Sequence, residues 1–166
     1  MSALVIEDAA GADAAAIADV RNAAAEWLTR AFGRGHWSLE CTAAGVARGL
    51  TGSRVLVARE DGRVIGTLRL AAKKPWAIDA RAFTSVERAL YLLDMAVAPE
   101  RQRSGVGRRL LEAADGAARA WPAASIRLDA YDAPAGAGPF YARCGYREIG
   151  RAVYRGVPLL YFERRL

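Results

Sequence analysis

Residues 95–111 read MAVAPERQRSGVGRRLL, and this stretch decides the fold class. An apolar run ends at Pro99, a basic turn with two glycines follows, and apolar residues then recur at helical spacing from Val106. Such a turn leaves backbone N–H groups without partners at the start of a helix, where the helix dipole also favours negative charge. Because Gly105 and Gly107 carry no side chains, an anion can approach the backbone closely. The stretch therefore predicts a cradle for a pyrophosphate group.

The charges around the turn support the same interpretation. Arg103 and Arg108, with Arg101 nearby, supply planar donors suited to phosphate oxygens. The turn is not a Walker loop, because no Gly-Lys-Ser/Thr sequence follows the glycines, and it lacks the three glycines of a dinucleotide fingerprint. The remaining alternative is a plain tight turn with a solvated arginine face. The apolar strand before the turn and the periodic helix after it favour the cradle.

Hydrophobic periodicity on either side of this stretch predicts a single α/β or α+β domain over residues 1–166. The expected strands are 4–6, 55–59, 64–70, 89–97, 126–130, 146–154 and 159–164, and the expected helices are 13–31, 42–50, 105–120 and 139–143. Asp61-Gly62 is a strong hairpin signal that makes the first half of the sheet antiparallel. The strand–helix–strand unit over 89–130 requires a parallel crossover. The result is a mixed central sheet of about seven strands flanked by about four helices.

Length and composition fit one globular domain, with 166 residues of which 53% are apolar and 25% charged. No window approaches the ~18 uninterrupted apolar residues of a membrane span, and the first ten residues do not resemble a secretory signal. Cys41 and Cys144 cannot build a disulfide framework, so we expect a reducing, cytoplasmic setting. The net charge is +6, with scattered arginines that are attributed mainly to a GC-rich genome rather than to an anionic partner.

Two motifs resemble those of a known family. Gln102-Arg-Ser-Gly-Val-Gly107 resembles the Q/R-x-x-G-x-G/A motif of the GNAT superfamily of acyl-CoA-dependent N-acyltransferases. Pro139-Phe-Tyr-Ala-Arg-Cys-Gly-Tyr146 resembles that family's F-Y-x-x-x-G-F/Y segment. The two motifs occur in the family's order and on the expected elements. The resemblance implies a GNAT-like sheet that is splayed between its fourth and fifth strands, with acetyl-CoA as the acyl donor.

The resemblance also implies roles for individual residues. The backbone of the fourth strand, at Met95, Ala96 and Val97, would hold the pantetheine arm. The pyrophosphate would be held by Gln102, Arg103, Ser104, Gly105, Val106, Gly107 and Arg108. Tyr141 would protonate the departing thiolate, which suits a phenol because it is a neutral donor at pH 7; the alternative for it is simple packing. This chain has Pro134 where the family often has asparagine, and Asp132 is an alternative for the missing contact.

The residue that takes the amine proton is left open by the sequence. Asp94 is the only acid in its apolar strand, and a carboxylate is costly to bury there unless it is paired. Asp94 is therefore either a catalytic base or the partner of an arginine such as Arg69. Tyr91 occupies the position where several family members carry a base. Glu26 and His36 are weaker candidates, and a water chain is a further alternative.

We therefore expect an N-acetyltransferase that moves an acetyl group from acetyl-CoA to a primary amine of a small molecule or peptide, by direct attack in a ternary complex. The alternatives are a catalytically silent acyl-CoA-binding regulator and a basic nucleic-acid-binding module. One histidine and two distant cysteines predict no metal site, and we expect neither a nucleic-acid nor a membrane partner. Many family members form homodimers, so the resemblance allows one here. Five aromatic residues are candidates for an acceptor pocket or for core packing: Trp27, Phe32, Trp37, Trp76 and Phe83.

Overall fold

The computed structural model describes residues 2–166 and confirms the mixed α/β fold class. Its strands are β1 (Val5–Asp8), β2 (Arg54–Glu60), β3 (Arg63–Ala71), β4 (Ala89–Val97), β5 (Ser125–Tyr131), β6 (Arg147–Tyr154) and β7 (Val157–Arg165). Its α-helices are α1 (Ala14–Phe32), α2 (Ala43–Leu50), α3 (Val106–Ala120) and α4 (Gly138–Arg143). Every strand and helix expected from the sequence is present, with its ends shifted by at most two residues.

The chain forms two compact units. The first unit comprises the residues up to Leu70 together with Leu93–Ala114, and the second comprises Ala71–Leu92 together with Asp115–Leu166. β4 and α3 therefore each contribute residues to both units.

The strands follow the order β1-β2-β3-β4-β5-β7-β6 in a seven-stranded sheet. β4 pairs with β5 in parallel, from Ala89 opposite Ser125 to Tyr91 opposite Arg127. The β1–β2, β2–β3, β5–β7 and β6–β7 pairs are antiparallel. The predicted mixture of an antiparallel first half and a parallel strand–helix–strand unit is thus confirmed.

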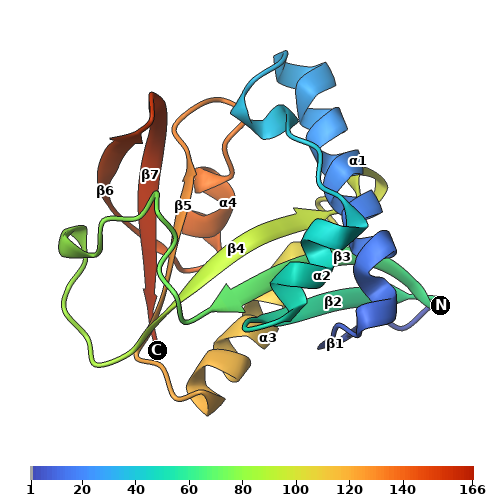
Figure 1. The fold of residues 1–166 in the computed structure, drawn as a ribbon, viewed down its shortest axis with the longest axis horizontal. Helices are drawn as coiled ribbons and strands as arrows, with labels where there is room; N and C mark the ends of the chain where they lie inside the picture. Colours follow the sequence, from blue (N-terminus) through green and yellow to red (C-terminus); the bar gives the residue numbers. More distant parts are fainter. Residues whose placement is uncertain (1) are drawn as a thin grey trace. The chain divides into compact units, whose positions relative to one another are not determined.

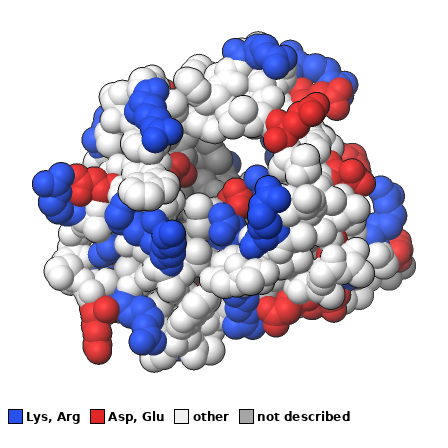
Figure 2. Space-filling model, in the orientation of Figure 1, with Lys and Arg blue, Asp and Glu red and all other residues white. Residues whose placement is uncertain are grey.

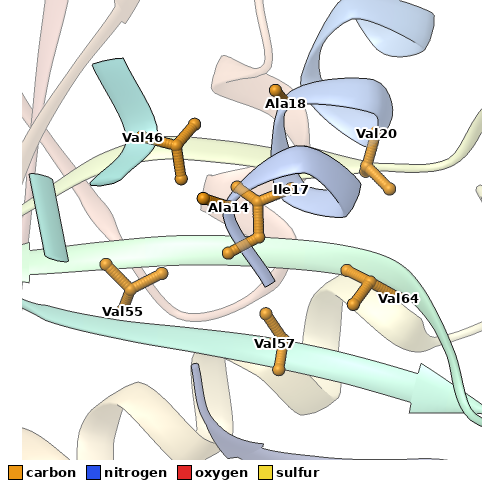
Figure 3. Packing of buried hydrophobic residues seen from close by; sticks show 8 residues of the cluster. All are labelled: Ala14, Ile17, Ala18, Val20, Val46, Val55, Val57 and Val64. Carbon is orange, nitrogen blue, oxygen red and sulfur yellow. The ribbon is translucent and has the colours of Figure 1, made fainter. Parts of the chain in front are cut away.

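In the first unit, α1 and α2 cover one face of β2 and β3 (Figure 1). Side chains from the helices and the strands point toward one another and form one apolar core (Figure 3). Its buried members are Ala14, Ile17, Ala18, Val20, Val46, Val55, Val57 and Val64. Burial of each Val or Ile contributes roughly 1.5–3 kcal/mol. The buried residues of α1 all lie in its first half, whereas Trp27 and Phe32 farther along the helix are 41% and 45% exposed.

α3 begins on the opposite face of the same strands. Gly66 lies opposite Ala58 in the register, so the two point away from the face that α1 covers. A Cβ built on Gly66 would lie 2.9 Å from Leu110 Cδ1 and 3.2 Å from Val106 Cγ1. Gly66 therefore allows the first turn of α3 to pack closely on β3, and this packing fixes the loop that precedes α3.

In the second unit, β7 lies between β5 and β6 (Figure 1). The long connection over 73–88 is anchored on β7 by Tyr161. The Tyr161 hydroxyl donates to the Ala77 carbonyl (2.5 Å) and accepts from the Asp79 N–H (3.1 Å), and the Phe83 ring stacks on Tyr161 at 5.4 Å. The connection is thus held against the sheet on the C-terminal side of Trp76, which is itself 81% exposed.

Candidate functional site

The backbone of the turn before α3 presents a row of unpaired N–H groups. Within residues 2–166, the structure gives no hydrogen-bond acceptor for the backbone N–H groups of residues 103–107. The first backbone bond after them runs from the Arg109 N–H to the Gly105 carbonyl at 3.1 Å. Arg103, Ser104 and Gly105 are exposed. Five successive donors at a helix N-terminus, the first three of them on exposed residues, form a site for an anion.

The shape of this turn comes from two residues with left-handed backbone. Arg103 has a φ of +59° and Gly105 a φ of +89°. Left-handed residues in a turn direct successive N–H groups toward one concave point, which is a recurrent way of binding phosphate. Glycine adopts this conformation without steric cost, whereas arginine does so only under constraint. The glycine that the sequence motif contains at position 105 is therefore required by the turn itself.

Two side-chain bonds hold the turn in place. The Gln102 amide donates from Nε2 to the Val97 carbonyl at 3.1 Å, which ties the turn to the end of β4. The Ser104 hydroxyl donates from Oγ to the Arg101 carbonyl at 2.5 Å. Both residues belong to the predicted pyrophosphate set, and the structure shows that their side chains shape the turn. We call residues 102–108 the cradle.

The arginines around the cradle differ in their exposure and surroundings. Arg101 forms an ion pair with Glu60, with 2.5 Å between Nη2 and Oε1, so part of its charge is already neutralised. Arg103 and Arg108 are exposed residues of the cradle. Of the three predicted arginines, Arg101 is therefore the one whose first role is to fasten the turn to β2.

Asp94 lies in the first unit, one residue before the strand positions expected to hold the pantetheine arm. Its φ of +55° is left-handed, which interrupts the regular alternation of β4. Its carboxylate accepts from Arg69 Nε (2.9 Å) and from Arg21 Nη2 (3.2 Å). The arginine partner that the sequence allowed, Arg69, is thus present, and Arg21 is a second one.

Tyr141 lies in the second unit, on the short helix α4. Its side chain is buried among three aromatic rings, with centroid distances of 5.3 Å to Phe140, 5.7 Å to Tyr146 and 6.1 Å to Phe162. Burial raises the pKa of the Tyr141 phenol well above its ordinary value, and the nearby charge of Asp129 raises it further. The phenol is therefore fully protonated at neutral pH, as a proton donor must be.

Asp129 on β5 is a candidate that reasoning from the sequence missed. Burial raises the pKa of its carboxyl, and no basic side chain pairs with it within the described part of the chain. Its charge also acts on Tyr131 and Tyr141. A half-buried carboxylate without a cation partner is typical of functional sites. The available signal was an acid in the middle of a short apolar strand.

The remaining predicted candidates have other surroundings. The Tyr91 hydroxyl is buried and accepts from Arg127 Nη1 at 3.4 Å. Glu26 pairs with Arg30 on the exposed side of α1, and Asp132 pairs with Arg151. Phe83 is buried, whereas Trp76 is exposed. His36 is an exposed residue of a short 3-10 helix. None of these contacts indicates a proton acceptor.

The charged residues do not form a continuous basic surface on the face that Figure 2 shows, where Lys and Arg atoms are interrupted by Asp and Glu atoms and by neutral ones. A nucleic-acid interface requires basic residues that cluster along one face. Among residues 2–166, no group of His, Cys, Asp or Glu side chains is arranged to hold a metal ion. Over the same residues, no helix has both the length and the apolar composition needed to span a bilayer.

A mixed sheet in which a backbone cradle follows the fourth strand is the arrangement that the resemblance to acyl-CoA-dependent N-acyltransferases implied. The family model described as an acetyltransferase (GNAT) domain matches residues 51–148, which is more than half of the chain. The chain therefore belongs to the GNAT acetyltransferase family, whose acyl donor is acetyl-CoA. Comparison with the curated proteins gives no match.

Solved structures show the same fold at low sequence identity. The ribosomal-protein-alanine N-acetyltransferase from Brucella melitensis is 21% identical, with a TM-score of 0.74 over 98% of this chain and 99% of that chain. The PaiA N-acetyltransferase from Thermoplasma acidophilum, in complex with coenzyme A, is 15% identical, with a TM-score of 0.74 over 99% of each chain. YncA from Salmonella typhimurium, with its cofactor acetyl-CoA, is 22% identical, with a TM-score of 0.73 over 99% of this chain and 94% of that chain.

Proposed function

We propose that the chain acts as one domain that transfers an acetyl group from acetyl-CoA to a primary amine of a small molecule or peptide, by direct attack in a ternary complex. The observation that carries the proposal is the row of unpaired N–H groups over residues 103–107, held by two left-handed residues at the start of α3. A diphosphate is the ligand that such a row fits, and membership of the GNAT family supplies the acyl donor.

The proposed cofactor site divides between β4 and the cradle. The backbone of Met95, Ala96 and Val97 binds the pantetheine arm as an additional strand would, and residues 102–108 bind the pyrophosphate. The anchoring of the cradle on Val97 through Gln102 supports this division, because it keeps the two parts in a fixed relation. Preorganised donors of this kind bind without a cost of reordering.

Tyr141 and Asp129 are proposed to move protons. Acetyl-CoA supplies the thioester carbonyl that the amine attacks, and the C–S bond breaks as the C–N bond forms. Tyr141 gives its hydroxyl proton to the thiolate that leaves. Asp129 takes the proton that the amine loses. Its raised pKa, and the lack of a basic partner among residues 2–166, support this role. Asp94 is a weaker candidate because its carboxylate already pairs with Arg21 and Arg69. Asp94 then remains in the site as a positioning residue.

Two measurements test the proposed function. Coenzyme A at micromolar concentration should raise the melting temperature, because a ligand that binds only the folded state stabilises it. Acetyl-CoA consumption should then appear with at least one member of a panel of amines, polyamines, amino acids, aminoglycosides and peptide N-termini. Stabilisation without turnover across the panel would instead support a silent acyl-CoA-binding regulator. Absence of stabilisation, with salt-sensitive binding to RNA or DNA, would overturn the cradle as a coenzyme site.

A further inference from the structure

A small hollow opens beside Asp94 in the first unit. Its polar side is formed by Arg21 of α1, Arg69 of β3 and Asp94 of β4, and the remaining lining comes from both helices and strands: Ile17, Gly45, Val46, Val55, Thr67 and Leu68. Its volume is about 20 Å³. A space of roughly 10–15 Å³ admits one water molecule, so the hollow has room for about one water or for a single oxygen of a carboxylate.

The charges in the hollow favour an anion. Two guanidinium groups face one carboxylate, which leaves one positive charge uncompensated. Arg69 uses only Nε and Arg21 only Nη2 to reach Asp94, and within residues 2–166 the structure gives neither guanidinium another hydrogen bond. Because a guanidinium carries five N–H donors, the two Nη groups of Arg69 remain as a planar pair suited to a carboxylate.

Stability does not account for this arrangement. The three side chains are 28%, 27% and 32% exposed for Arg21, Arg69 and Asp94, and ion pairs this exposed add little to stability. Asp94 nevertheless holds a left-handed backbone conformation in the middle of a strand, which costs free energy and is typical of functional sites. A Cβ built on Gly49 of α2 would lie 3.4 Å from Arg69 Cδ, which is an ordinary packing contact. Arg69 therefore passes alongside α2 with its charge only partly paired.

One residue of the hollow, Asp94, is the sequence neighbour of the proposed cofactor site. Asp94 directly precedes Met95, the first strand residue proposed to bind the pantetheine arm. A group held by the partners of Asp94 is therefore held next to the strand that carries the acyl donor. This is where an acceptor must be oriented for its amine to attack the thioester.

We infer that Arg21 and Arg69, held in place by Asp94, bind the carboxylate of the acyl acceptor, so that the preferred substrates are amines that also carry a carboxylate, such as free amino acids. The inference rests on the proposed function for its acceptor and deepens it by naming the substrate class. Arg69 supplies the paired donors, Arg21 adds charge from α1, and Asp94 positions both.

The test compares matched acceptors that differ only in the carboxylate. Acetyl-CoA consumption is measured with the L-amino acids and with their C-terminal amides. Free acids should be used with at least a tenfold higher kcat/KM than the amides. Arg69→Gln and Arg21→Gln should each raise KM for the acids by tenfold or more and change KM for the amides much less, while the melting-temperature shift caused by coenzyme A stays as in the parent. Arg30→Gln is the matched control on α1, because Arg30 pairs only with Glu26 at the surface.

Binding measured without turnover separates this inference from the proposed function. Calorimetry is carried out with the protein saturated with coenzyme A, using the same acids and amides. Binding of acids but not amides supports the hollow even where no acetyl transfer is found, and the proposed function alone then fails. Equal use or equal binding of acids and amides, or equal effects of Arg69→Gln on both, overturns the inference. Arg69→Lys, which keeps the charge, replaces Arg69→Gln where the latter fails to fold.

Discussion

Arg127 on β5 and Glu163 on β7 form an ion pair in the interior of the second unit. They lie opposite each other in the register, 3.4 Å separates Nε from Oε1, and their side chains are only 6% and 4% exposed. Arg127 also donates from Nη2 to the Thr84 carbonyl at 2.7 Å and lies over the Phe83 ring at 4.8 Å. One buried guanidinium therefore connects two strands to the long connection between β3 and β4.

Breaking this pair should destabilise the protein strongly. Glu163→Gln removes the negative charge and leaves the Arg127 guanidinium buried without compensation, which costs about 3–5 kcal/mol of unfolding free energy. Urea denaturation followed by circular dichroism measures the loss. Arg151→Gln is the control, because Arg151 pairs with Asp132 at a 68% exposed side chain, and its loss should cost less than about 1 kcal/mol. Equal effects of the two variants would contradict a buried, energetically coupled pair.

A carboxylate placed in the cradle should abolish cofactor binding. Gly107→Glu adds bulk and negative charge in the first turn of α3, where the structure presents unpaired N–H groups for a diphosphate. We expect the melting-temperature shift with coenzyme A to disappear while the protein remains folded. Gly116→Glu on the same helix is the control, since Gly116 is exposed with no atom within 4 Å of its added Cβ. A retained shift in Gly107→Glu would place the diphosphate elsewhere.

Local patterns in the sequence were sufficient for most of the fold. A nearly continuous apolar run located β4 at Ala89–Val97, the bounds that the structure gives. The cradle was also predictable, because glycines, a strand end and a helix start are all properties of one short stretch. The left-handed φ of Gly105 is the physical reason that the motif could be read from sequence alone.

Contacts between distant residues could not be read in this way. The second partner of Asp94 is Arg21, which lies 73 residues away on α1. Arg127 and Asp129 alternate with apolar residues on β5 and so resemble a solvated face, yet Arg127 is 5% exposed. Their burial depends on the connection over 73–88 and on the opposing strand β7. The pairing of Asp94 and the missing partner of Asp129 are therefore properties of the folded chain that local patterns do not encode.

Removal of one phenolic hydroxyl should slow the reaction without affecting cofactor binding. Tyr141→Phe deletes the proposed proton donor and should lower kcat by about 100-fold or more, the range typical of general acid catalysis. Its coenzyme A melting shift should be preserved. Tyr146→Phe is the neighbouring control: among residues 2–166 the buried Tyr146 hydroxyl has no hydrogen-bond partner, so its removal should leave kcat unchanged. An unchanged kcat in Tyr141→Phe would exclude Tyr141 from the mechanism.

The pH dependence of turnover should report the proposed base. In the parent protein, kcat/KM should rise with pH as the Asp129 carboxyl, whose pKa is raised by burial, loses its proton. Asp129→Asn should lower kcat/KM by about 100-fold and remove that acidic limb of the profile. Asp94→Asn should keep the limb, because Asp94 is proposed only to position two arginines. A limb that persists in Asp129→Asn and vanishes in Asp94→Asn would exchange the two roles.

The same carboxyl should affect stability, in a direction fixed by its pKa. Below pH 3.8, the ordinary value, Asp129 is protonated in both the folded and the unfolded chain, and its protonation adds no pH dependence. As the pH rises above 3.8, the unfolded chain releases this proton first, because burial raises the pKa of Asp129 in the folded state. The folded state therefore loses stability relative to the unfolded state, and this loss continues until the pH passes the folded-state pKa. Asp129→Asn lacks this penalty, so urea titrations between pH 3 and pH 7 should show its unfolding free energy rising relative to that of the parent. A difference that is constant with pH, or one that shrinks, would show that Asp129 is not held in a desolvated, unpaired state.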